Sequence, residues 1–307
     1  MNALEVDGLS VSFTQYTGGL KQRKVRVIHD LHLTIQAGEI VAVVGSSGSG
    51  KSLLAHAVLG ILPSNAVMTG SIRYNGEELT AERAAGLRGR DIALVPQSVT
   101  FLDPLMRVGA QVRSSVREGD AAAKQRAAFE RFRLAPDTER KYPFELSGGM
   151  ARRVLVSTAT VGGARLIIAD EPTPGLDPAV VQEALDGLRE LADGGCAVML
   201  ITHDIESALA VADKVAVFYA GTTVEVAQAG DFAGSGSSLR HPYTRALWRA
   251  LPQNDFAPIS GFQPHPDALP PGCLFAPRCA NATDGCGAAM PAMQELRGGR
   301  VRCIHAT

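Results

Sequence analysis

The chain has 307 residues, enough for one large domain with an appendage or for two domains. Its 30 Lys and Arg residues against 31 Asp and Glu residues give a formal net charge of −1, so overall charge does not favour nucleic acid or anionic lipid as a partner. The first residues, MNALEVDGLSVSF, carry acids and no apolar core, and no run of about 18 apolar residues follows. We therefore expect a cytosolic protein without a signal peptide, in which cysteines usually stay reduced.

Alternating apolar residues predict strands in the first part of the chain. Residues 4–13 and 25–35 alternate as half-buried strands do, and residues 39–44 form a continuous apolar run suited to a buried strand. A glycine-rich turn and a predicted helix follow this run. Asn75-Gly76, directly after 71–74, predicts a hairpin turn.

Strands and helices are predicted to alternate from there to about residue 230. Residues 121–134 have helical composition, and the inward positions are expected to be Ala128, Phe129, Phe132 and Leu134. Apolar strands are predicted at 166–169, 197–202 and 215–219, with a helix at 179–193, and this order favours a largely parallel α/β core. The GSGSS stretch at 234–238 and nine prolines from Pro242 onward predict a tail built on turns, not on a regular sheet.

The phosphate-binding motif G-x-x-x-x-G-K-[ST] lies between a predicted strand and a predicted helix. Its residues are Gly45, Ser46, Ser47, Gly48, Ser49, Gly50, Lys51 and Ser52. Glycines let successive N–H groups face the phosphates, and the start of the helix adds positive potential. Lys51 would reach the β- and γ-phosphates, and Ser52 would give its hydroxyl to Mg²⁺. The motif predicts a nucleoside triphosphate site, against the alternative of a chance glycine-rich turn.

Two acids follow the apolar strand at 166–169. Asp170 stands where a carboxylate can hold Mg²⁺ through water, beside the phosphate loop. Glu171 is placed to polarise the attacking water as a general base. His203, after the strand at 197–202, could contact the γ-phosphate, although a lone histidine after a strand is more often structural.

A second anion-binding helix start is predicted at the stretch LSGGM, residues 146–150. The Ser147 side chain and the N–H groups of Gly148 and Gly149 precede a helix-like segment. One chain needs only one phosphate cradle per nucleotide. A second cradle makes sense if it faces a nucleotide bound to a different subunit.

Six motifs in this order resemble the ATP-binding cassette (ABC) ATPases over about residues 4–230. They are the phosphate loop, Gln97 in VPQS, LSGGM, LIIADE at 166–171, Gly175-Leu176-Asp177, and Thr202-His203-Asp204. The resemblance implies an α/β P-loop NTPase domain over 1–230, with a RecA-like core, an antiparallel β subdomain and a helical subdomain at about 98–160. It also implies ATP hydrolysis with Mg²⁺ in a head-to-tail dimer, where each ATP lies between one subunit's phosphate loop and the other's LSGGM.

The resemblance implies roles for further single residues. Gln97 would contact Mg²⁺ and link the site to a membrane partner, and Asp177 would lie across the dimer interface. His203 would sense the γ-phosphate. An aromatic residue near the first strand usually stacks on adenine in this family; Phe13 is the preferred candidate and Tyr16 the alternative.

The tail, residues 231–307, resembles the C-terminal extension of the dipeptide, oligopeptide and nickel importers, from HPYTRAL at 241–247 through a proline-rich stretch to the cysteines. That resemblance implies an ATPase bound peripherally to the cytoplasmic face of the membrane. Its partners would be two transmembrane permeases, an extracytoplasmic substrate-binding protein and a second, identical or homologous ATPase, but no nucleic acid. Peptide cargo is favoured over nickel or a metal chelate on base rate alone.

Two other classes of protein are less favoured. Soluble ABC proteins of translation or DNA repair usually carry two cassettes or a long coiled-coil insertion, and the distance from Gln97 to Leu146 is too short for one. A non-catalytic regulatory subunit would be expected to lack Glu171 or His203, and both are present.

Four of the five cysteines lie in the last 35 residues, at Cys273, Cys279, Cys286 and Cys303. Four thiolates can hold a [4Fe–4S] cluster or a zinc ion. Structural zinc usually shows a tight C-x2–4-C pair, which is absent here, so the looser spacing favours the cluster that some relatives are reported to carry. Zinc and unligated thiols remain the alternatives.

Overall fold

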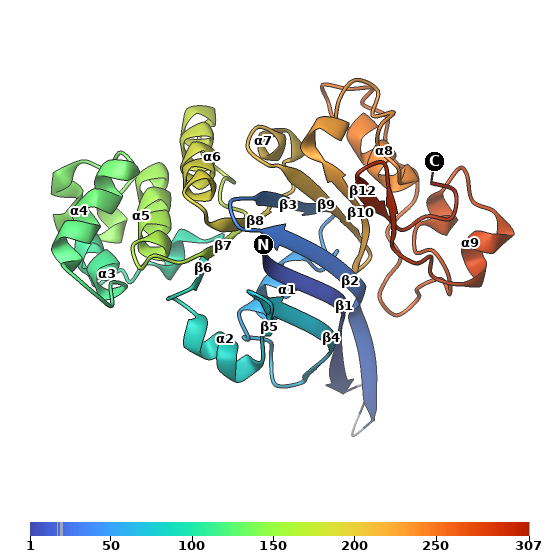
Figure 1. The fold of residues 1–307 in the computed structure, drawn as a ribbon, viewed down its shortest axis with the longest axis horizontal. Helices are drawn as coiled ribbons and strands as arrows, with labels where there is room; N and C mark the ends of the chain where they lie inside the picture. Colours follow the sequence, from blue (N-terminus) through green and yellow to red (C-terminus); the bar gives the residue numbers. More distant parts are fainter. Residues whose placement is uncertain (17, 19–20, 307) are drawn as a thin grey trace.

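The computed structural model describes residues 1–16, 18 and 21–306, and two sheets organise this part of the chain (Figure 1). The larger sheet has the strand order β11-β12-β10-β9-β3-β8-β7-β6, and the smaller has the order β2-β1-β4-β5. No helix in the described ranges is long and apolar enough to cross a bilayer.

The centre of the larger sheet is parallel. Strands β9, β3, β8, β7 and β6 run in one direction, with β10 antiparallel beside β9. The bounds are β3 (Ile40–Gly45), β6 (Ile92–Val95), β7 (Leu166–Asp170), β8 (Ala197–Ile201), β9 (Lys214–Tyr219) and β10 (Thr222–Gln228). These apolar runs are buried because one face packs on α6 (Pro178–Asp193) and α7 (Ile205–Leu209), and the other on α1 (Lys51–Val58) and the smaller sheet.

The smaller sheet is antiparallel throughout. It consists of β1 (Asn2–Tyr16), β2 (Gln22–Gln36), β4 (Ala66–Tyr74) and β5 (Glu77–Glu78), followed by α2 (Ala81–Leu87). The predicted hairpin turn is confirmed: Asn75 and Gly76, between β4 and β5, have φ angles of 51° and 80°. The alternation of apolar residues in both long strands is explained by one face packing on the core.

A helical lobe lies at the left end of Figure 1. Its helices are α3 (Val108–Ser114), α4 (Ala121–Arg131) and α5 (Gly148–Thr160), with short 3₁₀ turns at Val99–Phe101, Pro136–Arg140 and Pro143–Glu145. The predicted inward positions on 121–134 are confirmed, since Ala128, Phe129, Phe132 and Leu134 are all buried. The lobe has a small core of its own between these helices.

The tail differs from its prediction, because it continues the larger sheet. Strand β12 (Gly299–Val301) pairs antiparallel with β10, and β11 (Gln294–Leu296) pairs with β12. The tail also contains α8 (Pro242–Arg249), α9 (Asp284–Ala288) and a 3₁₀ turn at Ala276–Arg278, and a 3₁₀ turn at Ala229–Asp231 leads into it. The expectation of turns without a regular sheet was wrong because strands of three residues are too short to show a periodicity.

A buried ion pair joins the tail to β10. The side chains of Arg240 and Glu225 are 1% and 0% exposed, and Arg240 Nη1 lies 3.3 Å from Glu225 Oε1. The same carboxylate accepts the main-chain N–H groups of Arg240 and His241 at 2.9 and 2.8 Å. Arg240 also donates to the carbonyls of Leu296 and Arg297 in the turn between β11 and β12. One guanidinium therefore holds the hairpin of the tail against the sheet.

We expect Glu225→Gln to lower the free energy of unfolding by about 3 kcal/mol, because the buried guanidinium keeps only the Asp231 carboxylate, at 2.8 Å, and two buried main-chain N–H groups lose their charged acceptor. Urea unfolding followed by circular dichroism measures this change. The matched control is Asp255→Asn, which breaks the Arg249–Asp255 pair where both side chains are about half exposed, and it should change the value by less than about 1 kcal/mol. Equal effects of the two variants would contradict the prediction.

Candidate active site

A groove of about 480 Å³ opens at the carboxyl ends of the parallel strands. It is lined by Val27, Ser47, Gly48, Ser49, Gly50, Lys51, Ser52, Leu53, Gln97, Glu171 and His203. Residues predicted from four separate motifs therefore meet in one depression. This is the place where ligands bind in open α/β sheets.

The phosphate loop begins where β3 passes close to β9. Gly45 has a φ of 156°, and a Cβ atom there would lie 2.4 Å from the Phe218 carbonyl oxygen of β9. Gly50, with a φ of 95°, is the residue from which α1 begins. Side chains at these two positions would clash or be strained, so glycine is required for the loop to turn from strand into helix.

The Lys51 ammonium lies inside the loop. Its Nζ donates to the carbonyls of Gly45 and Ser46 at 2.8 and 3.2 Å. Burial lowers the pKa of Lys51, while the charges of Glu171 and Asp170 raise it. The cation is thus held within the curve of the backbone, where an incoming phosphate would replace the carbonyls as its partner.

Ser52 and Asp170 bring two oxygen atoms together from different elements. Ser52 Oγ, in the first turn of α1, donates to Asp170 Oδ1 at the end of β7, at 3.3 Å. Burial raises the pKa of Asp170, against the hydrogen bond from Ser52, which lowers it. A hydroxyl and a carboxylate side by side next to a phosphate loop match the ligands that Mg²⁺ takes in nucleotide sites.

Glu171 and His203 form a second pair across the groove. His203 Nδ1 lies 3.0 and 2.9 Å from the two carboxylate oxygens of Glu171. The Glu171 backbone has a φ of 47°, a conformation that costs energy for a residue other than glycine and is concentrated at functional sites. Both residues line the groove, so a carboxylate with the chemistry of a general base lies beside the phosphate loop.

The second predicted cradle lies outside this groove. Ser147 caps α5, where its Oγ accepts the Met150 N–H at 3.3 Å, so the start of LSGGM belongs to the helical lobe. Asp177 caps α6 and accepts the Ala179 N–H at 3.0 Å. None of these predicted residues lines the groove around the phosphate loop; this applies to Ser147, Gly148, Gly149 and Asp177.

The predicted aromatic residues also lie outside the lining. Phe13 is half-buried against the core beneath the smaller sheet, and Tyr16 is 66% exposed and accepts a hydrogen bond from Gln22. The residue of β2 that lines the groove is Val27, which no sequence motif marked. Its place follows from the packing of β2 against the turn at Gly221, where a Cβ atom would lie 2.0 Å from the Val27 carbonyl oxygen.

Sequence reasoning also missed Arg152, in the helix that follows LSGGM. Arg152 is 5% exposed, and burial lowers its pKa. Its Nη1 donates to the carbonyl of Pro96 at 2.7 Å, directly before Gln97. This contact links α5 to the segment that carries Gln97 into the groove.

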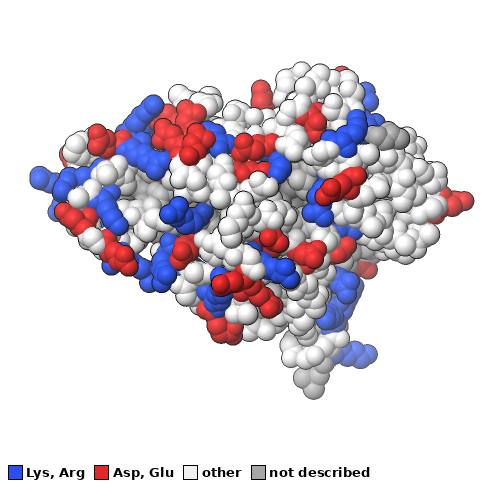
Figure 2. Space-filling view, in the orientation of Figure 1, with Lys and Arg blue, Asp and Glu red and all other residues white. Residues whose placement is uncertain are grey.

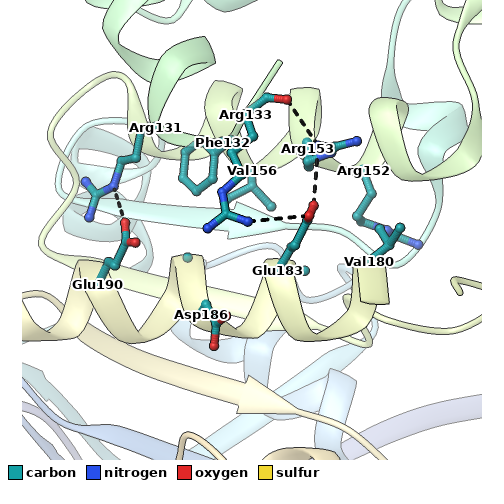
Figure 3. A pocket seen from close by; sticks show the side chains of 12 residues that line it. Arg131, Phe132, Arg133, Arg152, Arg153, Val156, Val180, Glu183, Asp186 and Glu190 are labelled. Carbon is teal, nitrogen blue, oxygen red and sulfur yellow. Dashed lines mark hydrogen bonds and ion pairs between the residues drawn. The ribbon is translucent and has the colours of Figure 1, made fainter. Parts of the chain in front are cut away.

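Arg152 borders a second cavity, between the helical lobe and α6, which is unsuited to a nucleotide. Figure 3 shows its ion pairs, in which Arg131 faces Glu190 while Arg133 and Arg153 face Glu183, at 3.4–3.5 Å. The cavity measures about 30 Å³, which is room for about one water molecule. The arginines here therefore join helices and do not form a ligand pocket.

The four cysteines of the tail are free thiols in one neighbourhood. Burial raises the pKa of Cys273 and Cys303, and the nearby thiols raise it further. Main-chain N–H groups point at two of the sulfurs, from Thr283 to Cys286 Sγ at 3.5 Å and from His305 to Cys303 Sγ at 3.4 Å. Among the described residues, no three or more His, Cys, Asp or Glu side chains lie close enough together to hold a metal ion as they stand.

Comparisons with known families and proteins agree with the motifs. The family described as "ABC transporter" matches residues 28–174, and "Oligopeptide/dipeptide transporter, C-terminal region" matches residues 224–286. The dipeptide transport ATP-binding protein DppD of Escherichia coli is 35% identical over 324 residues, covering 99% of this chain and 97% of DppD. The oligopeptide transport ATP-binding protein OppD of Salmonella typhimurium is 36% identical over 317 residues, covering 97% and 92%.

A solved structure of a dimeric bacterial ABC transporter cassette shares the fold of this chain. It aligns with a TM-score of 0.64 at 22% identity, covering 74% of this chain and 98% of the cassette. The likeness supports the arrangement of the two sheets and the helical lobe as an ABC cassette.

We expect Lys51→Met to weaken the binding of ATP at least tenfold, because the variant keeps an unbranched side chain that is shorter by one atom but loses the charge-assisted hydrogen bonds to phosphate, worth about 1.5–3 kcal/mol. Isothermal titration measures the affinity. Lys24→Met, at an exposed position on β2, is the matched control and should bind like the unmodified protein. An unchanged affinity in the Lys51 variant would contradict the prediction.

Proposed function

The chain belongs to the ABC transporter ATPase family, and from this premise we propose that it is the ATP-hydrolysing subunit of a peptide importer. The observation that carries the proposal is the convergence of the phosphate loop, the Ser52–Asp170 pair and the Glu171–His203 pair in one groove. Relatives of nearly the same length are the ATP-binding proteins of dipeptide and oligopeptide transport.

Hydrolysis follows from the placement of these groups. The N–H groups of the loop and the Lys51 ammonium bind the β- and γ-phosphates. Ser52, Asp170 and Gln97 would hold Mg²⁺, which would supply neutralisation of the phosphate charge. Glu171 accepts a proton from water as its oxygen attacks the γ-phosphorus; the bond to the β-phosphate oxygen breaks, and ADP and phosphate leave. His203 orients Glu171 and contacts the γ-phosphate.

A second cassette completes the site. Ser147, Gly148, Gly149 and Asp177 lie away from this chain's own groove, which is consistent with their acting on the nucleotide of a partner. A head-to-tail pair would place one LSGGM helix start against each bound γ-phosphate. ATP then closes the pair and hydrolysis reopens it. The second ATPase would be either an identical chain or a homologous one.

The rest of the assembly follows from the family. Two transmembrane permeases and an extracytoplasmic substrate-binding protein would supply the passage and the capture of cargo, with this chain at the cytoplasmic face of the membrane. The names of DppD and OppD support peptides over nickel or a metal chelate as cargo. The cassette would comprise residues 1–230, with its helical subdomain at about 98–160, and the transporter-type extension residues 231–307.

Cys273, Cys279, Cys286 and Cys303 are proposed as ligands of a [4Fe–4S] cluster, with zinc as the alternative. The support is the set of four neighbouring thiols and the N–H groups directed at their sulfurs, which stabilise thiolates around metals. A bound cluster would supply a covalent cross-link within the tail. Cys286 and Cys303 are buried, which shields such a centre from solvent.

We expect Glu171→Gln to bind ATP but to hydrolyse it about 10²- to 10⁴-fold more slowly, because the amide cannot accept the proton of water. Phosphate release measures the rate, and size-exclusion chromatography with ATP should show an accumulated closed dimer. Glu206→Gln, an exposed residue of α7, is the control and should hydrolyse ATP normally. Turnover by Glu171→Gln at the unmodified rate would contradict its role as base.

For the tail, anaerobic purification of the full chain should give brown protein with about four irons per chain. Cys286→Ser should lose the colour and the iron, while Cys196→Ser, outside the tail, should keep both. Colourless protein with one zinc per chain would favour the alternative ligand. Metal-free protein that is stable and active would refute both.

A further inference from the structure

Gln263, in the tail, contacts the phosphate loop through its side chain. The Ser46 hydroxyl donates to Gln263 Oε1 at 2.5 Å, across 217 positions of sequence. The same oxygen accepts the Ala220 N–H, at the turn between β9 and β10, at 3.3 Å. One amide oxygen thus ties the loop, the turn and the tail together.

Ser46 connects Gln263 to the hydrogen bonds inside the phosphate loop. Its carbonyl accepts the Ser49 N–H and the Lys51 ammonium, both at 3.2 Å. The side chain of Ser46 is therefore held from outside by Gln263, while its carbonyl faces the loop's own donors. A displacement of Ser46 would move one of the two carbonyls that accept from the Lys51 ammonium.

The segment carrying Gln263 is itself fastened down. Arg278 donates from Nε to the Ser260 carbonyl at 2.7 Å and from Nη2 to the Ile259 carbonyl at 3.2 Å. Its third nitrogen donates to the Tyr219 hydroxyl at 3.2 Å, and the guanidinium lies over the Tyr219 ring. Gln263 therefore extends from a segment anchored to the end of β9.

Tyr243, in the first turn of α8, supplies a second neighbour of Ser46. Its ring packs on Tyr219, with centroids 4.5 Å apart, and on Phe275, at 5.3 Å. Burial raises the pKa of the Tyr243 hydroxyl, while hydrogen bonding with the side chain and main chain of Ser46 lowers it. The tail thus meets the start of the phosphate loop from two elements.

We propose that Gln263 is a positioning residue for the phosphate loop, holding Ser46 and the main chain around it in the arrangement that binds ATP. This inference rests on the proposed function and deepens it. A loop already held in place loses less conformational freedom when the nucleotide binds, so the contact lowers the Kd and KM for ATP. Gln263 touches no reacting atom, and turnover at saturating ATP is therefore independent of it.

The test compares the unmodified full chain with Gln263→Met, which keeps the approximate size of the side chain but replaces the amide oxygen with a thioether, a much weaker acceptor. The KM for ATP and the Kd for a non-hydrolysable ATP analogue should rise about fivefold to tenfold, the effect of one lost hydrogen bond. The kcat should stay within about twofold, since no chemical group is removed. Gln253→Met, at an exposed position of the same tail, is the matched control and should leave Kd, KM and kcat unchanged.

A double-variant cycle with Ser46→Ala separates positioning from general damage. If the two side chains act through one hydrogen bond, Gln263→Met should add no further rise in Kd on the Ser46→Ala background. An unchanged Kd in Gln263→Met, or fully additive effects in the double variant, would overturn the inference, as would a lower kcat and melting temperature with an unchanged KM. Each of these outcomes leaves hydrolysis by the unmodified chain intact, whereas an unmodified chain that neither binds nor hydrolyses ATP overturns the proposed function as well.

Discussion

The close approach of β3 to β9 at Gly45 determines where this chain can bind phosphate. Because a Cβ atom there would lie 2.4 Å from the Phe218 carbonyl, the backbone can leave the sheet at this point only as glycine, and the loop then curls over the ends of the neighbouring strands. Strands β7 and β8 are parallel to β3, with Asp170 in register with Ile201, so they end at the same edge and deliver Glu171 and His203 beside the loop. The parallel register therefore assembles a site from groups more than 100 residues apart.

Buried arginine side chains attach the tail to the two sheets. Arg240 reaches Glu225 on β10, and Arg302, which is 2% exposed, reaches the Asp30 carboxylate on β2 at 2.8 Å. Burying these two guanidiniums costs desolvation, although Asp30 itself is 53% exposed. This cost is recovered only when the hydrogen bonds of both guanidiniums are well satisfied, so they favour one placement of the tail over others. Arg302 directly precedes Cys303, so this cysteine belongs to a segment fixed to both sheets, through Asp30 of β2 and Thr223 of β10. On the face shown in Figure 2 the tail carries few charged side chains, whereas acidic and basic side chains are interspersed over the helical lobe.

Local chemistry explains which parts of the molecule were predictable. Buried strands, the hairpin at Asn75-Gly76 and the inward face of 121–134 follow from periodicity and turn residues, and the phosphate loop follows from its own glycines. Other features depend on packing between distant segments and leave no local pattern. The three-residue strands of the tail acquire their structure from β10, Val27 lines the groove because β2 crosses a turn near it, and the contact of Gln263 with Ser46 joins segments 217 positions apart. The sequence shows an arginine at position 152, but it carries no pattern that predicts the contact of this side chain with the Pro96 carbonyl.

The helical lobe is attached differently from the tail. Its ion pairs to α6 span 3.4–3.5 Å and are partly exposed, and such pairs contribute at most about 1 kcal/mol each. Arg152 is buried, and its bond to the Pro96 carbonyl binds α5 to the chain directly before Gln97. Apolar contacts add to these ion pairs, because Phe132 and Val156 of the lobe are buried in one cluster with Leu185 and Leu188 of α6. The tail is thus held by buried charge at one side of the phosphate loop, and the lobe is held at the other by apolar packing on α6 and by the bond of Arg152 to the segment that carries Gln97.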